Sequence, residues 1–312
     1  EMYYVMKISI IGYRNHSLRL KKLLITEFNI EPIMWNHNTD EFSDLIGSDA
    51  IIIASPQDTH VEYIQKILSE SRESYIFCEK PPTTYSSELE YLNDLSYFQK
   101  EKIFFNFNYR FSELAKFVRS NDLGQPLHFN FISSHGLALK EGFKDNWRFK
   151  SSNKFMGVLG TVGIHYIDLS HWLLGDSVST SFDEINISGS RLSDTATINM
   201  EFESGCSVNI FVSYATPFIN KSELIFTNGM VVLDDGVLDV YRDRNTFDDN
   251  GNFKKPKKEN IVSFKSSRDY YNDSLEKSLE EFIRVVKKRG SFSPANFIYS
   301  MASNRILLNQ RS

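Results

Sequence analysis

Three polar side chains stand at helical spacing in the segment from Gly157 to Gly175. Thr161, His165 and Asp168 occupy positions i, i+4 and i+7, so a helix places them along one face. A histidine held by an acid one turn away can accept a proton near neutral pH. The pattern therefore predicts that His165 is a catalytic base, with Thr161 and Asp168 in support. The alternative is a core helix in which His165 makes only an interior hydrogen bond.

The same segment has two further features of a closely packed helix. An apolar stripe at helical spacing predicts one buried face, formed by Leu159, Val162, Tyr166, Leu169 and Leu173. A glycine inside a helix costs about 1 kcal/mol relative to alanine, yet the segment contains Gly157, Gly160 and Gly163. We infer that another backbone or a ligand approaches this helix closely.

Lys80 is the second candidate for proton transfer. It lies in the tripeptide Glu79-Lys80-Pro81, directly after the apolar run 75–78. A lysine at the carboxyl end of a parallel strand can exchange a proton with a substrate hydroxyl, and burial beside a cationic nicotinamide would lower its pKa. The alternative is a surface ion pair between Glu79 and Lys80.

The first strand-to-helix turn retains part of a dinucleotide fingerprint. In GxGxxG the glycines allow a tight turn, a close approach to pyrophosphate and close helix packing. Here Gly12 is present, whereas Arg14 and Ser17 occupy the other two places. Arg14 can replace part of the lost backbone site with a charge-assisted contact to phosphate; the alternative is an ordinary turn.

The end of the second strand does not distinguish NAD from NADP. An acid there typically binds the ribose hydroxyls, and an arginine marks a 2′-phosphate site. The sequence reads Trp35-Asn36-His37-Asn38, with neither residue type. Asn36 or His37 can still hydrogen-bond the ribose, so either cofactor remains open.

The elements that position these residues fall into two patterns. Apolar runs alternate with helical patterns in the first third of the chain, which predicts a parallel sheet covered on both faces with ligands at the carboxyl ends of its strands; these runs are 7–12, 31–36, 49–56, 74–79 and 102–110. Polar and apolar residues alternate afterwards, as in a sheet with one open face; these strands are 127–134, 194–214, 222–240 and 260–264. We place the domains at 1–119 and 120–312.

Composition excludes several classes of function. The net charge of −5 argues against a phosphate-backbone binder, so no nucleic-acid partner is expected. No apolar run is long enough to span a bilayer, and the first residues lack the zones of a signal peptide. Cys78 and Cys206 are too few for a disulfide framework or a thiolate metal site. We expect a cytoplasmic protein without a metal, and we interpret the charged segment 241–259 as a solvated hairpin loop.

An ordered set of motifs resembles the Gfo/Idh/MocA family of sugar and inositol dehydrogenases. The motifs are Ser48 to His60, Cys78-Glu-Lys-Pro81, Asn106-Phe-Asn-Tyr-Arg-Phe111, Asn146-Trp-Arg148, Gly157 to Gly175, and the strand Asp194-Thr-Ala-Thr197 followed by Glu203-Ser-Gly205. The resemblance implies an α/β fold: an N-terminal Rossmann doubly wound parallel sheet and a C-terminal α/β domain with a large open, mostly antiparallel sheet. It also implies that copies of the chain associate through that open sheet, as a homodimer or homotetramer.

The resemblance implies roles for individual residues. Lys80 would contact nicotinamide and the substrate hydroxyl, and His165 would take the hydroxyl proton. Trp147 and Arg148 would face the junction of cofactor and substrate, so the expected substrate residues are Lys80, Trp147, Arg148, Thr161 and His165. With the turn residues above, the expected NAD or NADP site comprises Gly12, Arg14, Asn15, Asn36, His37, Ser55, Pro56, Thr59, His60, Glu79, Lys80 and Asn108.

The expected function is hydride transfer between nicotinamide and a secondary alcohol or ketone of a sugar, cyclitol or nucleotide-sugar. Thr161 stands where the family often has an acid, and Asp168 matches a family position that more often supports the helix. Two alternatives follow: a catalytically weakened member that acts as a binding or regulatory protein, and a redox-neutral enzyme that retains its cofactor.

Overall fold

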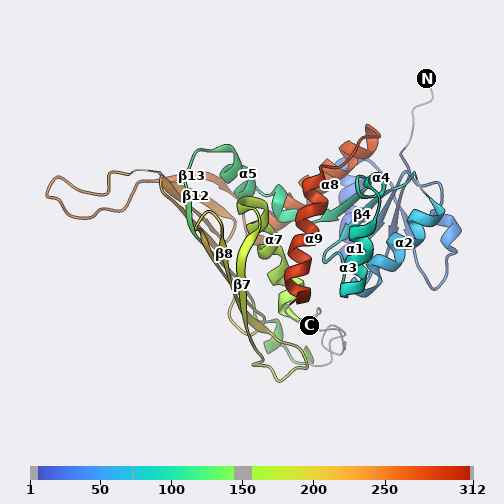
Figure 1. Ribbon diagram of the computed structural model, residues 1–312, viewed down its shortest axis with the longest axis horizontal. Coiled ribbons are helices and arrows are strands. Elements are labelled where there is room, and N and C mark those ends of the chain that lie inside the picture. The colour runs from blue at the N-terminus through green and yellow to red at the C-terminus, as the bar shows by residue number, and fades with distance from the viewer. Residues whose placement is uncertain (1–5, 72, 144–156, 243, 310–312) are drawn as a thin grey trace. The chain divides into compact units, whose positions relative to one another are not determined.

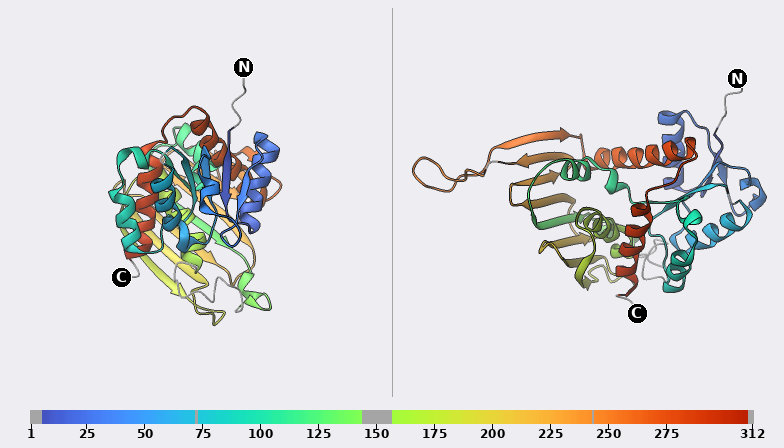
Figure 2. Two further views of the ribbon diagram at one scale, coloured as in Figure 1. Left: turned by 90° about the vertical axis from the view of Figure 1, so that its right-hand side faces the viewer. Right: turned by 45° about the horizontal axis from the view of Figure 1, so that its top comes forward.

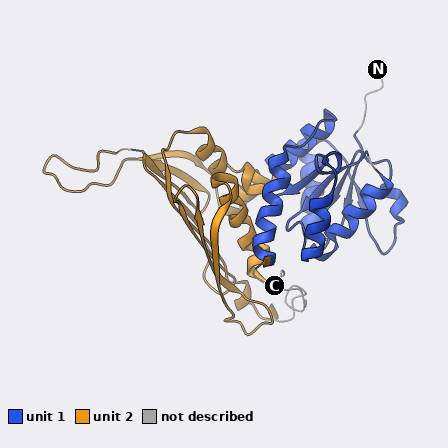
Figure 3. Ribbon diagram, in the orientation of Figure 1, with its two compact units in different colours: residues 1–107, 276–308 blue, residues 108–275, 309–312 orange. Residues whose placement is uncertain are grey.

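The computed structural model describes residues 6–71, 73–143, 157–242 and 244–309. It divides the chain into two compact units (Figure 3): unit 1 contains residues 1–107 and 276–308, and unit 2 contains residues 108–275 and 309–312. Our sequence-based boundary lay at 119/120 and assigned the whole C-terminus to the second domain. The units differ from that division because Phe282, near the C-terminal end of the chain, packs against Phe77 and Phe104 of the first sheet.

Unit 1 is built on a parallel sheet of five strands in the order β2-β1-β3-β4-β5. The strands are β1 (Ile8–Ile11), β2 (Ile33–Trp35), β3 (Ala50–Ile53), β4 (Tyr75–Glu79) and β5 (Ile103–Asn106). Every residue of β1, β3, β4 and β5 is buried, as expected for strands covered on both faces. The chain reverses its direction of travel across the sheet between β2 and β3, which confirms the doubly wound arrangement.

Helices cover both faces of this sheet. Figure 2 shows α1 on one side and α3 on the other. The helices of unit 1 are α1 (Asn15–Phe28), α2 (His60–Glu70), α3 (Ser86–Asp94), α4 (Tyr97–Lys100), α9 (Pro294–Asn309) and the larger part of α8 (Ser267–Lys287). The segment 86–100 contains two helices, α3 and α4, because Ser96 caps α4 and exchanges hydrogen bonds with Gln99.

Unit 2 contains an eight-stranded sheet in the order β13-β12-β11-β10-β6-β9-β8-β7. Only β6 and β9 pair in parallel; the other neighbours are antiparallel, which confirms the predicted mostly antiparallel sheet. The strands are β6 (Pro126–Ser134), β7 (Ser177–Ile185), β8 (Thr195–Phe202), β9 (Ser207–Ser213), β10 (Ile219–Phe226), β11 (Gly229–Asp234), β12 (Val237–Tyr241) and β13 (Lys258–Ser263).

One face of this sheet packs on helices and the other is open. Along β8, Ile198 and Met200 are buried, whereas Asn199 and Glu201 are exposed. The helices α5 (Glu113–Ser120) and α7 (Ile164–Leu174) lie on the buried side (Figure 1). The long loop between β12 and β13 extends away from the sheet, as predicted for a solvated hairpin.

The glycine-rich segment before α7 is a π-helical turn over Leu159–Gly163. A Cβ at Gly163 would lie 3.2 Å from Ile198 Cδ1 on the sheet below. The close approach that the glycines predicted is therefore, at Gly163, an approach to a packed side chain of β8.

No helix in the described part of the chain is long and apolar enough to cross a membrane. Cys78 and Cys206 are buried free thiols.

The outer strand β5 of unit 1 is paired on one side by β4 and contacted on the other by a side-chain amide. Asn296 of α9 accepts a hydrogen bond from the Phe105 N–H at 3.1 Å and donates to the Phe105 carbonyl at 3.3 Å. Both residues are buried, so no water is available to replace the amide.

We predict that Asn296→Ala lowers the free energy of unfolding by about 1–3 kcal/mol, because it leaves the buried Phe105 N–H without its partner, whereas the Phe105 carbonyl keeps the Phe107 N–H at 3.0 Å. Urea denaturation measures the change. The control is Asn250→Ala in the exposed hairpin loop, which should stay within about 0.5 kcal/mol of the parent protein. Equal losses in the two variants would contradict the importance of this contact.

Candidate functional site

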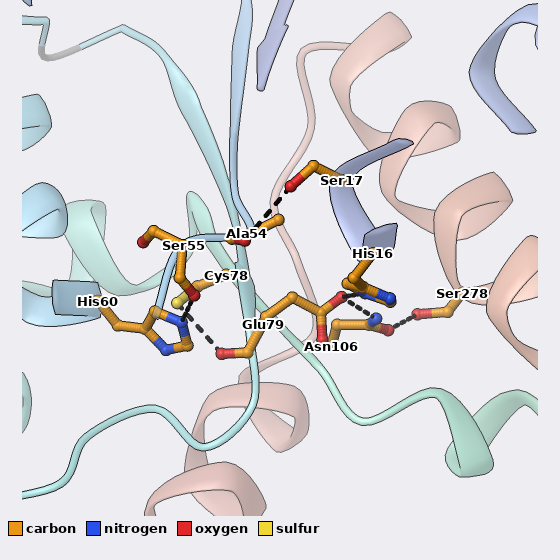
Figure 4. Close-up of polar contacts among 9 residues, drawn as sticks. All are labelled: His16, Ser17, Ala54, Ser55, His60, Cys78, Glu79, Asn106 and Ser278. Carbon is orange, nitrogen blue, oxygen red and sulfur yellow. Dashed lines mark hydrogen bonds and ion pairs between the residues drawn. The ribbon is translucent and has the colours of Figure 1, made fainter. Parts of the chain in front are cut away.

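The turn after β1 is forced to be tight by the neighbouring strand. Gly12 has a φ of +127°, and a Cβ there would lie 2.8 Å from the Ala54 carbonyl oxygen and 2.6 Å from Ser17 Oγ. Ser17 Oγ in turn donates to the Ala54 carbonyl at 3.4 Å (Figure 4). Gly12 is thus required at this position, while Ser17 fills the space beside it.

Helix α1 begins directly after this turn without an acidic group. Asn15 is its first residue, Arg14 is the N-cap residue with an extended backbone, and no acid lies in the first turn. The backbone N–H groups of a first helical turn have no partner within the helix and favour an anion. The end of β1 is therefore compatible with a phosphate.

The ends of β1 and β2 meet through two rings. Tyr13 stacks on His37 with ring centroids 6.2 Å apart. Asn36 uses its side-chain oxygen to accept from the Asn38 N–H, and its own N–H donates to Asp40 Oδ2 at 2.8 Å. The sequence pattern shows no acid directly at this strand end. The carboxylate that contacts Asn36 belongs to Asp40, four residues further along the chain.

The segment after β3 is joined to the segment after β4 by His60. Its ring nitrogens lie 2.8 Å from the Pro81 carbonyl and 3.2 Å from the Ser55 carbonyl. Burial lowers the pKa of His60, and the two carbonyl contacts oppose this only in part. A neutral imidazole has one N–H and can donate to only one of these carbonyls, but the ring still contacts both Pro81, which follows Lys80, and Ser55 at the end of β3.

The polar residues beside His60 form a second set of hydrogen bonds. Ser55 and Thr59 hydroxyls lie 2.7 Å apart, and Thr59 Oγ1 also donates to the Pro56 carbonyl at 2.7 Å. These three predicted cofactor residues therefore share one turn at the carboxyl end of β3.

Glu79, at the end of β4, contacts two other side chains through its carboxylate. Its Oε1 lies 2.7 Å from His16 Nε2 and accepts from Asn106 Nδ2 at 2.8 Å (Figure 4). Asn106 Oδ1 accepts from Ser278 Oγ at 2.7 Å. Sequence reasoning missed His16, Asn106 and Ser278, because nothing in their local patterns indicates that they meet.

In unit 2, His165 lies on α7 among tyrosines. Its ring centroid is 5.1 Å from that of Tyr109, which also contacts the rings of Tyr166, Tyr270 and Tyr271. Burial raises the pKa of Tyr109 well above its usual value, with smaller contributions from the neighbouring phenols. The phenol beside His165 is therefore neutral at neutral pH and able to donate a hydrogen bond.

Thr161 lies on the π-helical turn that precedes α7. Its Oγ1 donates to the Gly157 carbonyl at 2.8 Å and contacts the Tyr214 hydroxyl. The Tyr214 ring stacks on His135 with centroids 4.8 Å apart. Tyr214 therefore contacts Thr161, and His135 stacks on Tyr214. The sequence analysis identified neither Tyr214 nor His135.

Asp168 is held by a buried arginine. Arg110 Nε donates to Asp168 Oδ2 at 2.8 Å, and Arg110 Nη2 contacts Oδ1. Their side chains are 0% and 1% exposed, and the guanidinium lies 5.1 Å from the Trp172 ring centroid. Both carboxylate oxygens of Asp168 are thus occupied by a pairing that joins α7 to the segment before α5.

The remaining predicted residues lie in different places. Asn108 is buried in unit 2, where its Nδ2 donates to Ser274 Oγ at 2.7 Å. Lys80 belongs to unit 1 and His165 to unit 2, so their predicted meeting stays a prediction. Trp147 and Arg148 lie outside the described residues. Within the described ranges, no cluster of His, Cys, Asp and Glu could hold a metal ion.

Two regions of the chain match the same protein family. Residues 13–107 match "Oxidoreductase family, NAD-binding Rossmann fold", and residues 111–232 match "GFO/IDH/MocA C-terminal domain". The first region contains the sheet edge of unit 1, and the second contains α7 and much of the open sheet.

Individual relatives extend this similarity. Glucose-6-phosphate 3-dehydrogenase of Bacillus subtilis is 31% identical over 145 residues, which are 45% of this chain and 40% of that protein. The scyllo-inositol 2-dehydrogenase (NAD(+)) of the same organism is 22% identical over 212 residues, or 64% of this chain and 59% of that protein. The chain thus spans about two to three fifths of the length of these curated relatives.

A solved structure agrees in fold. A myo-inositol dehydrogenase from Corynebacterium glutamicum has a TM-score of 0.72 at 17% identity and covers 97% of this chain and 96% of its own. At this identity the similarity concerns the fold alone.

We predict that Asp168→Asn lowers the free energy of unfolding by about 3–5 kcal/mol, because the Arg110 charge stays buried without its counter-charge. The control is Glu281→Gln, which breaks the exposed pair with Arg284 and should cost no more than about 1 kcal/mol. Chemical denaturation compares the two, and a similar small loss in both would contradict a structural role for the buried pair.

Proposed function

The chain belongs to the Gfo/Idh/MocA oxidoreductase family, and from this premise we propose that it is an NAD(P)-dependent oxidoreductase of sugar-like secondary alcohols. The observation that carries the proposal is the carboxyl edge of the unit 1 sheet. There a glycine that no other residue can replace without a clash lies in the turn before α1, and Lys80 follows the end of β4. Ligands of open parallel sheets bind at this edge.

The residues of that edge fit a dinucleotide. We propose that the turn at Gly12 and the first N–H groups of α1 hold the pyrophosphate, with Arg14 as a charged contact. Asn15, Asn36 and His37 would lie along the ribose side, and the turn Ser55–Thr59 with His60 would border the rest. When bound, the nicotinamide accepts or supplies a hydride. The choice between NAD and NADP is left to titration with both.

We propose that Lys80 and His165 manage the proton of the substrate hydroxyl. Lys80 is half-buried at the end of β4, and the hydrogen bonds of His60 to its neighbours fix the backbone around it. His165 is buried beside the neutral phenol of Tyr109. Thr161 lies on the preceding π-helical turn, and its hydroxyl contacts that of Tyr214, which follows β9. Asp168 would act only by holding α7 in place through Arg110.

The proposed substrates are sugars, cyclitols or nucleotide-linked sugars. Support comes from the names of the relatives, which act on glucose 6-phosphate and scyllo-inositol. Hydroxyl donors and acceptors around α7, such as Thr161, Tyr214 and His135, suit a polyhydroxylated ligand. A cytoplasmic location stays a prediction.

We predict that Lys80→Met lowers turnover by about 10²–10⁴-fold, because the group that handles the hydroxyl proton is lost. The measurement begins with fluorescence titration of the parent protein with NADH and NADPH, followed by an activity screen of phosphorylated sugars, inositols and nucleotide-sugars. Lys22→Met, at an exposed position of α1, is the matched control and should keep full activity.

Three other outcomes would contradict parts of the proposed function. Full turnover by Lys80→Met would remove the lysine from the mechanism. Failure of the parent protein to bind either dinucleotide at millimolar concentration would favour a binding or regulatory protein. Conversion of substrate without net reduction of the nicotinamide would favour a redox-neutral enzyme.

We also propose that the open face of the unit 2 sheet joins copies of the chain into a dimer or tetramer. Polar and apolar side chains mix on this face, where Ile132 lies beside Phe211 in register. Ile219 and Ile225 are exposed on the adjacent strand. A surface of this kind fits a self-complementary interface.

Light scattering of the purified protein should give the molar mass of a dimer or a larger oligomer. Phe211→Asp should shift the mass towards that of the monomer, because a charge enters the apolar part of that face. Phe98→Asp, at a 75% exposed position of α4, is the control and should leave the mass unchanged. A monomeric parent protein, or an unchanged mass for Phe211→Asp, would contradict the proposed interface.

A further inference from the structure

One polar contact in unit 1 crosses the sheet edge from α1 to β4. His16 is the second residue of α1 and Glu79 is the last residue of β4, and their side chains approach to 2.7 Å (Figure 4). Strand β3 lies between β1 and β4 in the sheet. The contact therefore reaches over the carboxyl end of β3, beside the turn at Gly12.

The carboxylate in this contact is charged and largely removed from water. The Glu79 side chain is 11% exposed and that of His16 is 31% exposed. Burial raises the pKa of Glu79, but the opposing effects of His16, Asn106 and Lys80 together bring it below its usual value. A negative charge thus lies one side chain away from the first turn of α1.

Such a charge opposes the use of this edge as a phosphate site. A buried carboxylate is poorly screened and repels an anion held by nearby N–H groups. Two of the three fingerprint glycines are absent, so less backbone is available to offset the repulsion. A positive group must balance Glu79 for a dinucleotide to bind well.

We propose that His16 is a positioning residue of the dinucleotide site, whose side chain, 2.7 Å from the Glu79 carboxylate, offsets the negative charge and keeps the first turn of α1 receptive to phosphate. The inference rests on the proposed function, since it concerns the same cofactor. It goes further by naming a residue outside the fingerprint glycines and outside the expected contacts.

Glu79 is retained because it also organises the edge. Its carboxylate accepts from Asn106 at the end of β5, and Asn106 accepts from Ser278 on α8. These hydrogen bonds hold Glu79 in place directly before Lys80. The same carboxylate introduces the negative charge that His16 offsets. Replacement of both His16 and Glu79 should therefore weaken ligand binding less than replacement of His16 alone.

A double-mutant cycle on ligand affinity tests this directly. ADP-ribose, which contains both phosphates but no nicotinamide, is titrated calorimetrically into the parent protein, His16→Gln, Glu79→Gln and the double variant. We expect His16→Gln to weaken ADP-ribose binding about tenfold, and the double variant to return within about threefold of the parent. His128→Gln, on the unit 2 sheet, is the matched control and should bind like the parent.

The alternatives give different results. If the His16–Glu79 contact is only structural, Gln at position 16 can donate the same hydrogen bond and binds normally, or the double variant binds worst; either result overturns the inference. A parent protein that binds neither ADP-ribose nor NADH overturns the proposed function itself. A parent that binds while His16→Gln binds equally well overturns only the role of His16.

A second pair of variants covers the case in which His16→Gln does not fold. His16→Lys places a positive charge beside the Glu79 carboxylate and should bind ADP-ribose within about threefold of the parent. His16→Lys combined with Glu79→Gln leaves that charge without its carboxylate and should bind more tightly than His16→Lys alone. Equal or weaker binding by the combined variant would overturn the inference.

Discussion

The close approach of the turn after β1 to the end of β3 is the constraint on which the candidate cofactor edge depends. Gly12 can adopt its φ of +127° and leave room for the Ala54 carbonyl only because it has no side chain. That approach sets where α1 begins, and the start of α1 in turn brings His16 over β3 to Glu79. The geometry of the edge thus follows from one backbone contact between neighbouring parallel strands.

Two buried carboxylates illustrate different uses of charge in this protein. Asp168 is paired on both oxygens with Arg110 in a fully buried contact, and the pair joins two helical segments. Glu79 is paired with a partly exposed histidine at a strand end, where ligands of parallel sheets bind. A pair closed to solvent serves packing, whereas a pair at a binding edge also shapes the field that a ligand meets.

Much of the fold could be predicted from the sequence because it depends on local patterns. The apolar runs correctly predicted all five strands of unit 1, and the alternation of polar and apolar residues predicted most strands of the open sheet. Strand β7 was missed because its exposed, serine-rich sequence has little apolar alternation. The return of residues 276–308 to unit 1 was missed because it depends on contacts such as that between Phe282 and Phe77, which are far apart in the sequence.

The candidate site was predictable only in part, for a related reason. The motif residues at strand ends and on α7 were identified from order and spacing, and their roles remain proposals. His16 and Glu79 are 63 positions apart, and Thr161 and Tyr214 are 53 apart, so no local pattern indicates that they meet. The support of His165 by Asp168, predicted from their spacing, stays a prediction, and the contact of Arg110 with both Asp168 oxygens could not be predicted because the two residues are 58 positions apart.

The amide of Asn296 has a consequence for assembly errors. A sheet whose outer strand presents bare N–H and carbonyl groups can recruit a strand from another molecule, and aggregation often starts there. In unit 1 the helix α9 supplies a side chain that satisfies the middle of β5, so the ladder ends on a helix. This edge stays uncovered until α9 has formed and packed against β5, so the docking of α9 is the step that protects the sheet from self-templating.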